Sequence, residues 1–142
     1  MKIIITFVVL VVILTTLSFN LGYQSAKKGL IEVRKSKIHY KGVFANYPIK
    51  KDQIVEIAPY IVVNDKTPII NYVFYFKEQQ VYCLVLGYGS IYNHSNNPNI
   101  RFNVKNENQN FEYIANRDIK KGEELFIDYG AEYWTSRKII PI

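Results

Sequence analysis

The stretch from Leu86 to Asn99, LGYGSIYNHSNNPN, holds the densest group of side chains that could do chemistry. Asn93, His94 and Ser95 offer an amide, an imidazole and a hydroxyl in succession, and the two glycines let the backbone approach a ligand closely. The alternative is a turn whose side chains only bond their own backbone. The residue types therefore predict either a binding loop or such a turn.

A second group, GEELFIDYGAEYW, runs from Gly122 to Trp134. It places Tyr129 and Tyr133 four residues apart. Two of its acids could form a general acid and base pair, but nothing in their spacing sets the separation that such a pair needs. The simpler interpretation is that all four are solvated turn carboxylates: Glu123, Glu124, Asp128 and Glu132.

The remaining metal-binding and nucleophilic residue types are scarce. His39 and His94 are the only histidines and have no third ligand at a recognisable spacing, so we expect no catalytic metal. Cys83 is the single cysteine, which excludes an intrachain disulfide. Because it lies in an apolar run, we interpret it as a small core residue and not as a nucleophile.

Three motifs in this order resemble the SET-domain protein-lysine methyltransferases. They are KGVFA (Lys41 to Ala45), IYNHSNNPN (Ile91 to Asn99) and ANRDIKKGEELFIDYG (Ala115 to Gly130). The resemblance extends from about Ile31 to Arg137 and is similar to the compact viral and bacterial members without zinc-binding flanking domains. It implies a mainly β fold of small sheets with a knot-like crossing, which would bring the second and third motifs to one site.

The resemblance also implies a reaction and roles for particular residues. S-adenosylmethionine would bind on one face and the target lysine would enter from the other, through a narrow channel. Tyr129 matches the tyrosine at the methyl-transfer centre, which touches both. The other cofactor contacts would be Lys41, Gly42, Asn93, His94 through its backbone, and Trp134, whereas Tyr72 and Tyr133 would line the lysine channel.

One position departs from the family pattern. The family has a second glycine two residues before Gly42, where this chain has Tyr40. If that position needs a positive φ, a tyrosine there costs on the order of 1 to 2 kcal/mol and could block the cofactor pocket. The alternative is that Tyr40 turns outward and the loop shifts.

The sequence pattern predicts that the elements positioning these motifs are short strands. Runs rich in Ile, Val, Tyr and Phe alternate with polar turns, a pattern typical of β structure. The stretch Ile69 to Phe76 could be a strand or a short helix. We expect strands at Ile31 to Val33, Gly42 to Ala45, Ile54 to Val63, Val81 to Leu86, Ile100 to Val104, Phe111 to Ala115 and Glu124 to Ile127.

The first 28 residues form a hydrophobic leader, and residues 29–142 form the expected SET domain. Ile3 to Phe19 carries no ionisable side chain, and with Asn20 to Tyr23 it is long enough to span a bilayer as a helix. The excess of positive charge after it predicts a single-pass anchor with the SET domain in the cytosol. The alternative is a cleaved signal peptide, although no clear cleavage site follows. Removal of the leader would permit a nuclear or host-cell site.

Length and charge limit the function further. The 142 residues suit one domain, and 49% of them are hydrophobic, which excludes a disordered chain. The net charge is +6, but three of the 18 basic residues lie in the leader with no acid, which leaves only +3 elsewhere. This weak excess argues against direct nucleic-acid binding.

We therefore expect S-adenosylmethionine-dependent methylation of a lysine in a protein substrate, with a histone tail as one candidate. The resemblance to small members also permits a homodimer. The alternative is a membrane-anchored, non-catalytic SET-like interaction module that has lost cofactor use, for which Tyr40 is the sequence hint.

Overall fold

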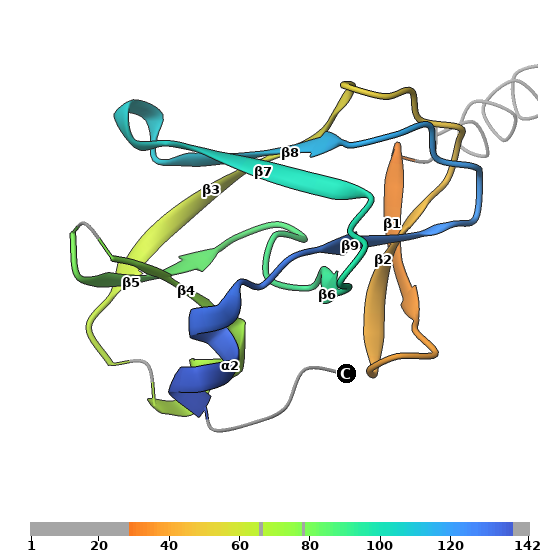
Figure 1. Cartoon of the computed structure of the whole chain (residues 1–142). Coiled ribbons are helices and arrows are strands. Elements are labelled where there is room, and N and C mark those ends of the chain that lie inside the picture. The colour runs from red at the N-terminus through yellow and green to blue at the C-terminus, as the bar shows by residue number, and fades with distance from the viewer. Residues whose placement is uncertain (1–28, 66, 78, 138–142) are drawn as a thin grey trace, which may run out of the picture.

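The computed structural model describes residues 29–65, 67–77 and 79–137, which fold into two curled sheets with one short helix (Figure 1). Most strands are short because polar turns interrupt the apolar runs. The elements are β1 (Ile31–Lys35), β2 (Lys41–Ala45), β3 (Ile54–Val63), η1 (Thr67–Tyr72), β4 (Val73–Phe76), β5 (Val81–Val85), β6 (Asn93–His94), β7 (Ile100–Lys105), η2 (Asn106–Asn108), β8 (Asn110–Ala115), β9 (Glu124–Ile127) and α2 (Ala131–Arg137).

The sheets differ in size and in strand direction. One has four strands in the order β1-β2-β9-β6, and the other has five in the order β4-β5-β3-β8-β7. All strand pairs are antiparallel except β6 with β9, where Asn93 faces Phe126 and His94 faces Ile127. This parallel pair joins the two chemically dense motifs, which are about thirty residues apart in the sequence.

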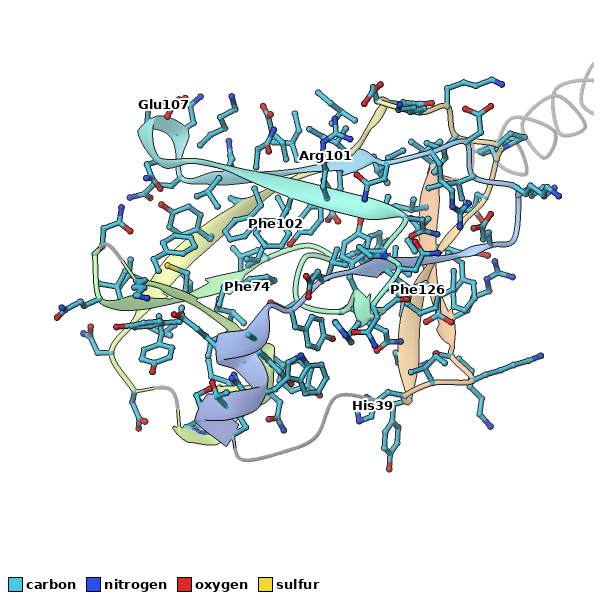
Figure 2. The ribbon with its side chains drawn as sticks, viewed as in Figure 1. His39, Phe74, Arg101, Phe102, Glu107 and Phe126 are labelled. Carbon is cyan, nitrogen blue, oxygen red and sulfur yellow. The ribbon has the colours of Figure 1, made fainter. Side chains whose placement is uncertain are left out.

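The larger sheet curls until side chains of its two edge strands, β4 and β7, meet, and aromatic side chains fill the space inside it. Phe74 from β4 and Phe102 from β7 point toward each other, with ring centroids 5.5 Å apart (Figure 2). Phe111 contacts both rings and is fully buried. Cys83 is also fully buried, and burial raises the pKa of its thiol, so the interpretation of it as an inert core residue agrees with the structure.

The mainly β fold was predicted correctly, and the observed strands lie within two residues of the expected ones. The ambiguous stretch from Ile69 to Phe76 contains both kinds of element: the short helix η1 ends at Tyr72, and the strand β4 begins at Val73. Three of the described elements were not predicted: β6, η2 and α2.

The expected membrane anchor lies outside the described residues, as does the leader that would contain it. Within the part of the chain that is described, no helix has the length and apolar character needed to cross a bilayer. The anchor and the cytosolic orientation stay predictions.

Tyr40 occupies the tip of the β1–β2 hairpin with a φ of 26°, a left-handed backbone that glycine adopts at no cost. The residue is 84% exposed, so its side chain turns outward into solvent. The sequence left open whether residue 40 needs a positive φ and whether Tyr40 turns outward, and the structure shows both features. The substitution therefore affects the backbone of the hairpin and does not fill the site.

Candidate functional site

The site is built where β6 lies alongside β9. Ser95 donates its backbone N–H to the carbonyl of Ile127 at 3.1 Å and extends the parallel pairing by one residue. Tyr129 follows two residues after β9, so the pairing sets it beside His94. The stretch Asn93 to Ser95 is thus held in a sheet and is not an isolated turn.

The His94 ring fixes the backbone of Tyr129. Its Nδ1 accepts the Tyr129 backbone N–H at 3.2 Å, and its Nε2 lies 3.2 Å from Oδ1 of Asn96, so Nε2 carries the proton. Only 7% of the His94 side chain is exposed. The ring therefore acts as a structural link between the two motifs, a role that the sequence did not indicate, while the resemblance concerned only its backbone.

Asn93 connects β6 to the start of β2. Its amide nitrogen donates to the carbonyl of Lys41 at 2.9 Å and to Oε1 of Glu124 at 2.8 Å. A side chain at Gly42 would collide with that carboxylate and with the Asn93 amide, so only glycine fits there. Among the described residues, no protein donor reaches Oδ1 of Asn93, which leaves this oxygen free to accept from an ammonium group of a ligand.

The interpretation of Glu124 as a solvated turn carboxylate was wrong. Glu124 is half-buried, and besides Asn93 it accepts the hydroxyl of Ser36 at 3.1 Å. Asp128 and Glu132 are exposed, as expected. Sequence reasoning missed Glu124 because its burial is decided by Gly42, a residue 82 positions earlier on a neighbouring strand.

The phenol of Tyr129 is held in one orientation. Its hydroxyl donates to the backbone carbonyl of Tyr92 at 2.7 Å. Burial, followed by the nearby Tyr133 phenol, raises the pKa of Tyr129 well above its usual value, so the group stays neutral. Because its proton is committed to a carbonyl, the oxygen can still accept a hydrogen bond from a ligand.

An aromatic cluster surrounds this phenol. Trp134 lies edge-on to His94 at 4.8 Å between centroids and is stacked on Tyr129 at 5.8 Å. Tyr133 lies 4.5 Å from Tyr129 and 4.9 Å from Trp134. Helix α2 supplies both Tyr133 and Trp134, so this helix completes the site although its sequence was not predicted as helical.

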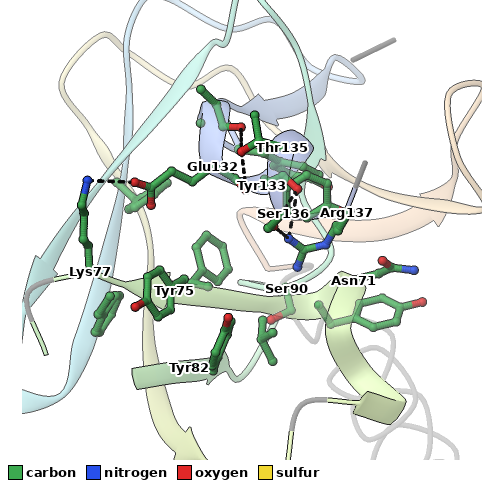
Figure 3. Close-up of a pocket in the computed structure, with 18 of the residues that line it drawn as sticks. Asn71, Tyr75, Lys77, Tyr82, Ser90, Glu132, Tyr133, Thr135, Ser136 and Arg137 are labelled. Carbon is green, nitrogen blue, oxygen red and sulfur yellow. Dashed lines mark hydrogen bonds and ion pairs between the residues drawn. The ribbon is translucent and has the colours of Figure 1, made fainter. Parts of the chain in front are cut away.

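A cavity of about 920 Å³ opens on one side of Tyr129, between α2 and the strands β4 and β5 (Figure 3). Tyr72 and Tyr133 line it, as does Tyr129 itself. Asn93, His94 and Trp134 do not line it, and neither do Lys41 and Gly42. The residues assigned to the lysine channel therefore share one cavity with Tyr129, and the other residues assigned to the cofactor do not line it.

Two contacts fasten α2 across the cavity. Glu132 pairs with Lys77 at 3.2 Å, and both side chains are more than half exposed (Figure 3). On the other side, Arg137 donates to the carbonyl of Ile70 in η1 and stacks its guanidinium 3.8 Å from the ring centroid of Tyr133. Arg137 is thus an unpredicted wall residue that brings a positive charge to the cavity.

No group of three or more histidine, cysteine or carboxylate side chains comes together as metal ligands in the described residues. The chemistry available at Tyr129 is instead positioning and desolvation. Tyr129 lines an aromatic cavity, and the Asn93 amide with the Glu124 carboxylate lies outside that cavity.

Comparison with known proteins identifies this arrangement. The SET domain family matches residues 41–130. The histone-lysine N-methyltransferase of Schizosaccharomyces pombe that is specific for H3 lysine-37 is 32% identical over 111 residues, which cover 73% of this chain and 76% of the yeast protein.

Solved structures agree with the sequence comparison. A Plasmodium falciparum protein named as a histone methyltransferase has a TM-score of 0.62 and 31% identity, over 75% of this chain and 98% of that one. A SET8 protein from Cryptosporidium has a TM-score of 0.56 and 27% identity, over 79% of this chain and 59% of that one.

The chain belongs to the SET domain family. Within that family it is a protein-lysine methyltransferase.

Proposed function

We propose that this enzyme transfers methyl groups from S-adenosylmethionine to a lysine of histone H3, with Tyr129 at the transfer centre. The observation that carries this proposal is the two-sided environment of Tyr129. Its phenol lines the cavity, while its backbone is bound by His94, next to Asn93, outside the cavity. The histone is proposed because H3 is the substrate named for the Schizosaccharomyces pombe relative.

The residues around Asn93 fit S-adenosylmethionine. Oδ1 of Asn93 is free to accept the ammonium of the cofactor's amino-acid part, because the amide nitrogen is already bound to Lys41 and Glu124. The side chain of Tyr40 is exposed to solvent and does not fill this site. Trp134 offers an apolar face next to His94 for an aromatic base.

The bound cofactor supplies an electrophilic methyl group, and the target amine must be neutral to attack it. A free lysine has a pKa of about 10.4, so neutralising it at pH 7 costs roughly 4 to 5 kcal/mol. The aromatic walls formed by Tyr72, Tyr129 and Tyr133 disfavour the ammonium form by desolvation. The guanidinium of Arg137, which lines the same cavity, disfavours it further by repulsion.

Tyr129 orients the neutral amine. Its hydroxyl proton is directed to the Tyr92 carbonyl, so the phenol oxygen can accept one amine N–H and turn the nitrogen lone pair away from the cavity walls. Holding the amine in line in this way can contribute several kcal/mol to the rate by removing orientational freedom. This chemistry needs no carboxylate base, and Glu132, which lines the cavity, is paired with Lys77.

The test is mass spectrometry of histone H3 incubated with the enzyme and S-adenosylmethionine, with Tyr129→Phe as the matched variant. We expect mass increases in steps of one methyl group with the natural chain, and a loss of rate on the order of 100-fold in the variant. Cofactor affinity and melting temperature should be unchanged in Tyr129→Phe. Equal turnover by the two proteins would contradict the role assigned to Tyr129. If H3 stays unmodified, the proposed substrate is wrong.

A further inference from the structure

Glu56 is a half-buried carboxylate on β3 that the proposed reaction does not use. Its Oε1 accepts the backbone N–H of Tyr88 at 2.8 Å, and its Oε2 accepts the hydroxyl of Tyr92 at 2.9 Å. Burial is the main reason why the pKa of this carboxyl is raised. Such a group is costly to bury without a partner, so its two bonds determine where the bonded segment can lie.

The bonded segment is the connection between β5 and β6. It turns at Gly87, whose φ of 63° belongs to the left-handed region, and an added Cβ there would lie 2.6 Å from Oε1 of Glu56. Tyr113 donates its hydroxyl to the carbonyl of Gly89 at 3.0 Å. Glu56 therefore holds both the start and the end of a segment that passes close to its carboxylate.

The end of this segment is Tyr92, which has two functions in the structure. Its side chain is 1% exposed, stacks on Tyr113 at 4.6 Å between centroids and donates to Glu56. Its backbone carbonyl accepts the Tyr129 hydroxyl at 2.7 Å. A continuous series of short hydrogen bonds and covalent bonds thus leads from Glu56 through Tyr92 to the phenol of Tyr129.

We infer that Glu56 is a positioning residue for methyl transfer: by binding the Tyr92 hydroxyl and the Tyr88 amide, it fixes the carbonyl that orients the Tyr129 phenol. The inference rests on the role proposed for Tyr129. Glu56 does not line the cavity and does not touch the substrate. Its effect is on the direction of the phenol oxygen, and reacting groups held about 1 Å out of place can lose roughly 100-fold in rate.

The first test is steady-state kinetics of Glu56→Gln in the full chain. Glutamine keeps the shape, but its NH2 is a donor, so it cannot accept the Tyr88 and Tyr92 bonds together and the Tyr92 hydroxyl has to turn its proton away from residue 56. We expect kcat to fall at least about 10-fold, while the KM for the substrate and the Kd for S-adenosylmethionine stay within about twofold. A folded Glu56→Gln protein with unchanged kcat would overturn the inference.

The matched control is Glu112→Gln. Glu112 lies on β8, opposite Ile57 of β3, and its carboxylate pairs only loosely with Lys105 at 3.9 Å. The same chemical change on the neighbouring strand should leave kcat, KM and the melting temperature unchanged. If Glu112→Gln lowers kcat as much as Glu56→Gln, the effect belongs to the sheet in general and the inference fails.

A double-mutant cycle separates positioning from general destabilisation. In the Tyr129→Phe background there is no phenol to orient, so adding Glu56→Gln should cause no further loss of kcat. Independent, multiplying losses would contradict the inference. If Glu56→Gln fails to fold, Tyr92→Phe serves in its place, because it removes the bonded hydroxyl and keeps the ring stacked on Tyr113.

A second readout does not depend on turnover. The carbon-13 resonance of the Tyr129 Cζ atom, assigned by its absence in Tyr129→Phe, reports the hydrogen bond of the phenol. We expect it to move in Glu56→Gln and to stay in Glu112→Gln. If the natural chain methylates no histone, the proposed substrate is wrong, but the resonance still tests the positioning role of Glu56. A resonance that does not move in Glu56→Gln overturns the inference.

Discussion

Asn93 and Tyr129 each have one polar atom bound to the protein. The Asn93 amide nitrogen donates to the Lys41 carbonyl and to Glu124, and the Tyr129 hydroxyl donates to the Tyr92 carbonyl, so the oxygen of each side chain keeps accepting capacity. Each group is therefore oriented before anything binds. This preorganisation removes reorganisation from the reaction itself.

Asn93→Ala should act mainly on the cofactor. Removing the amide leaves the carbonyl of Lys41 and the carboxylate of Glu124 without their donor, and it removes the free oxygen. We expect binding to weaken by about 1 to 3 kcal/mol. Isothermal titration with S-adenosylmethionine measures this, and an unchanged dissociation constant would show that Asn93 does not contact the cofactor.

The sequence predicted part of the site through its resemblance to the SET family. The residue types alone left Asn93 and His94 as a binding loop or a simple turn, and the role of Tyr129 followed from the matching motifs. Neither pointed to Glu56 or Glu124, since each looks like an ordinary polar position in a strand. Their importance comes from partners 36 and 31 residues away, Tyr92 and Asn93, and no local pattern records such contacts.

The elements that position these residues differ in how well they could be predicted from the sequence. The strands were predictable because runs rich in Ile, Val, Tyr and Phe are separated by polar turns. The pair β6 and β9 was not, because a strand of two residues has no period to detect, and its partner is selected by tertiary packing. Helix α2 has seven residues, too few to be stable alone, so its existence depends on contacts across the cavity.

We expect Arg137 to be the contact that holds α2. Its bond to the Ile70 carbonyl and its stacking on Tyr133 are partly buried, whereas the pair between Lys77 and Glu132 is exposed and contributes little. Arg137→Ala should speed amide hydrogen exchange in α2 about 10-fold, corresponding to roughly 1.4 kcal/mol. Lys77→Ala should change it much less, and equal effects of the two variants would contradict this ranking.

At the scale of the whole molecule, the fold brings two distant motifs to one point and leaves a cavity on one side of it. The larger sheet supplies the β4 and β5 walls, and the smaller sheet supplies Asn93 and the approach to Tyr129. Neither sheet alone contains both sides. The resemblance in the sequence implied this meeting of motifs, but the cavity between α2 and β4 depends on how the chain folds in three dimensions.

The stability of the whole chain should depend on the Glu56 carboxyl. Its pKa is raised in the folded state, so between its unfolded value of about 4.3 and the raised value the folded chain binds more protons. The free energy of unfolding therefore falls as pH rises through this interval and levels off above it. Urea unfolding at several weakly acidic pH values should show a shallower fall in Glu56→Gln, and parallel curves for the two proteins would contradict the assignment.

The most direct test of the account is a crystal structure of the chain with S-adenosylhomocysteine and a lysine-containing histone H3 peptide. We predict that the lysine side chain enters through the cavity between α2 and β4 and ends with its nitrogen beside the Tyr129 hydroxyl. The cofactor product should lie on the other side, next to Asn93 and Trp134. A structure with the cofactor in the cavity, or with the lysine far from Tyr129, would contradict the two-sided site.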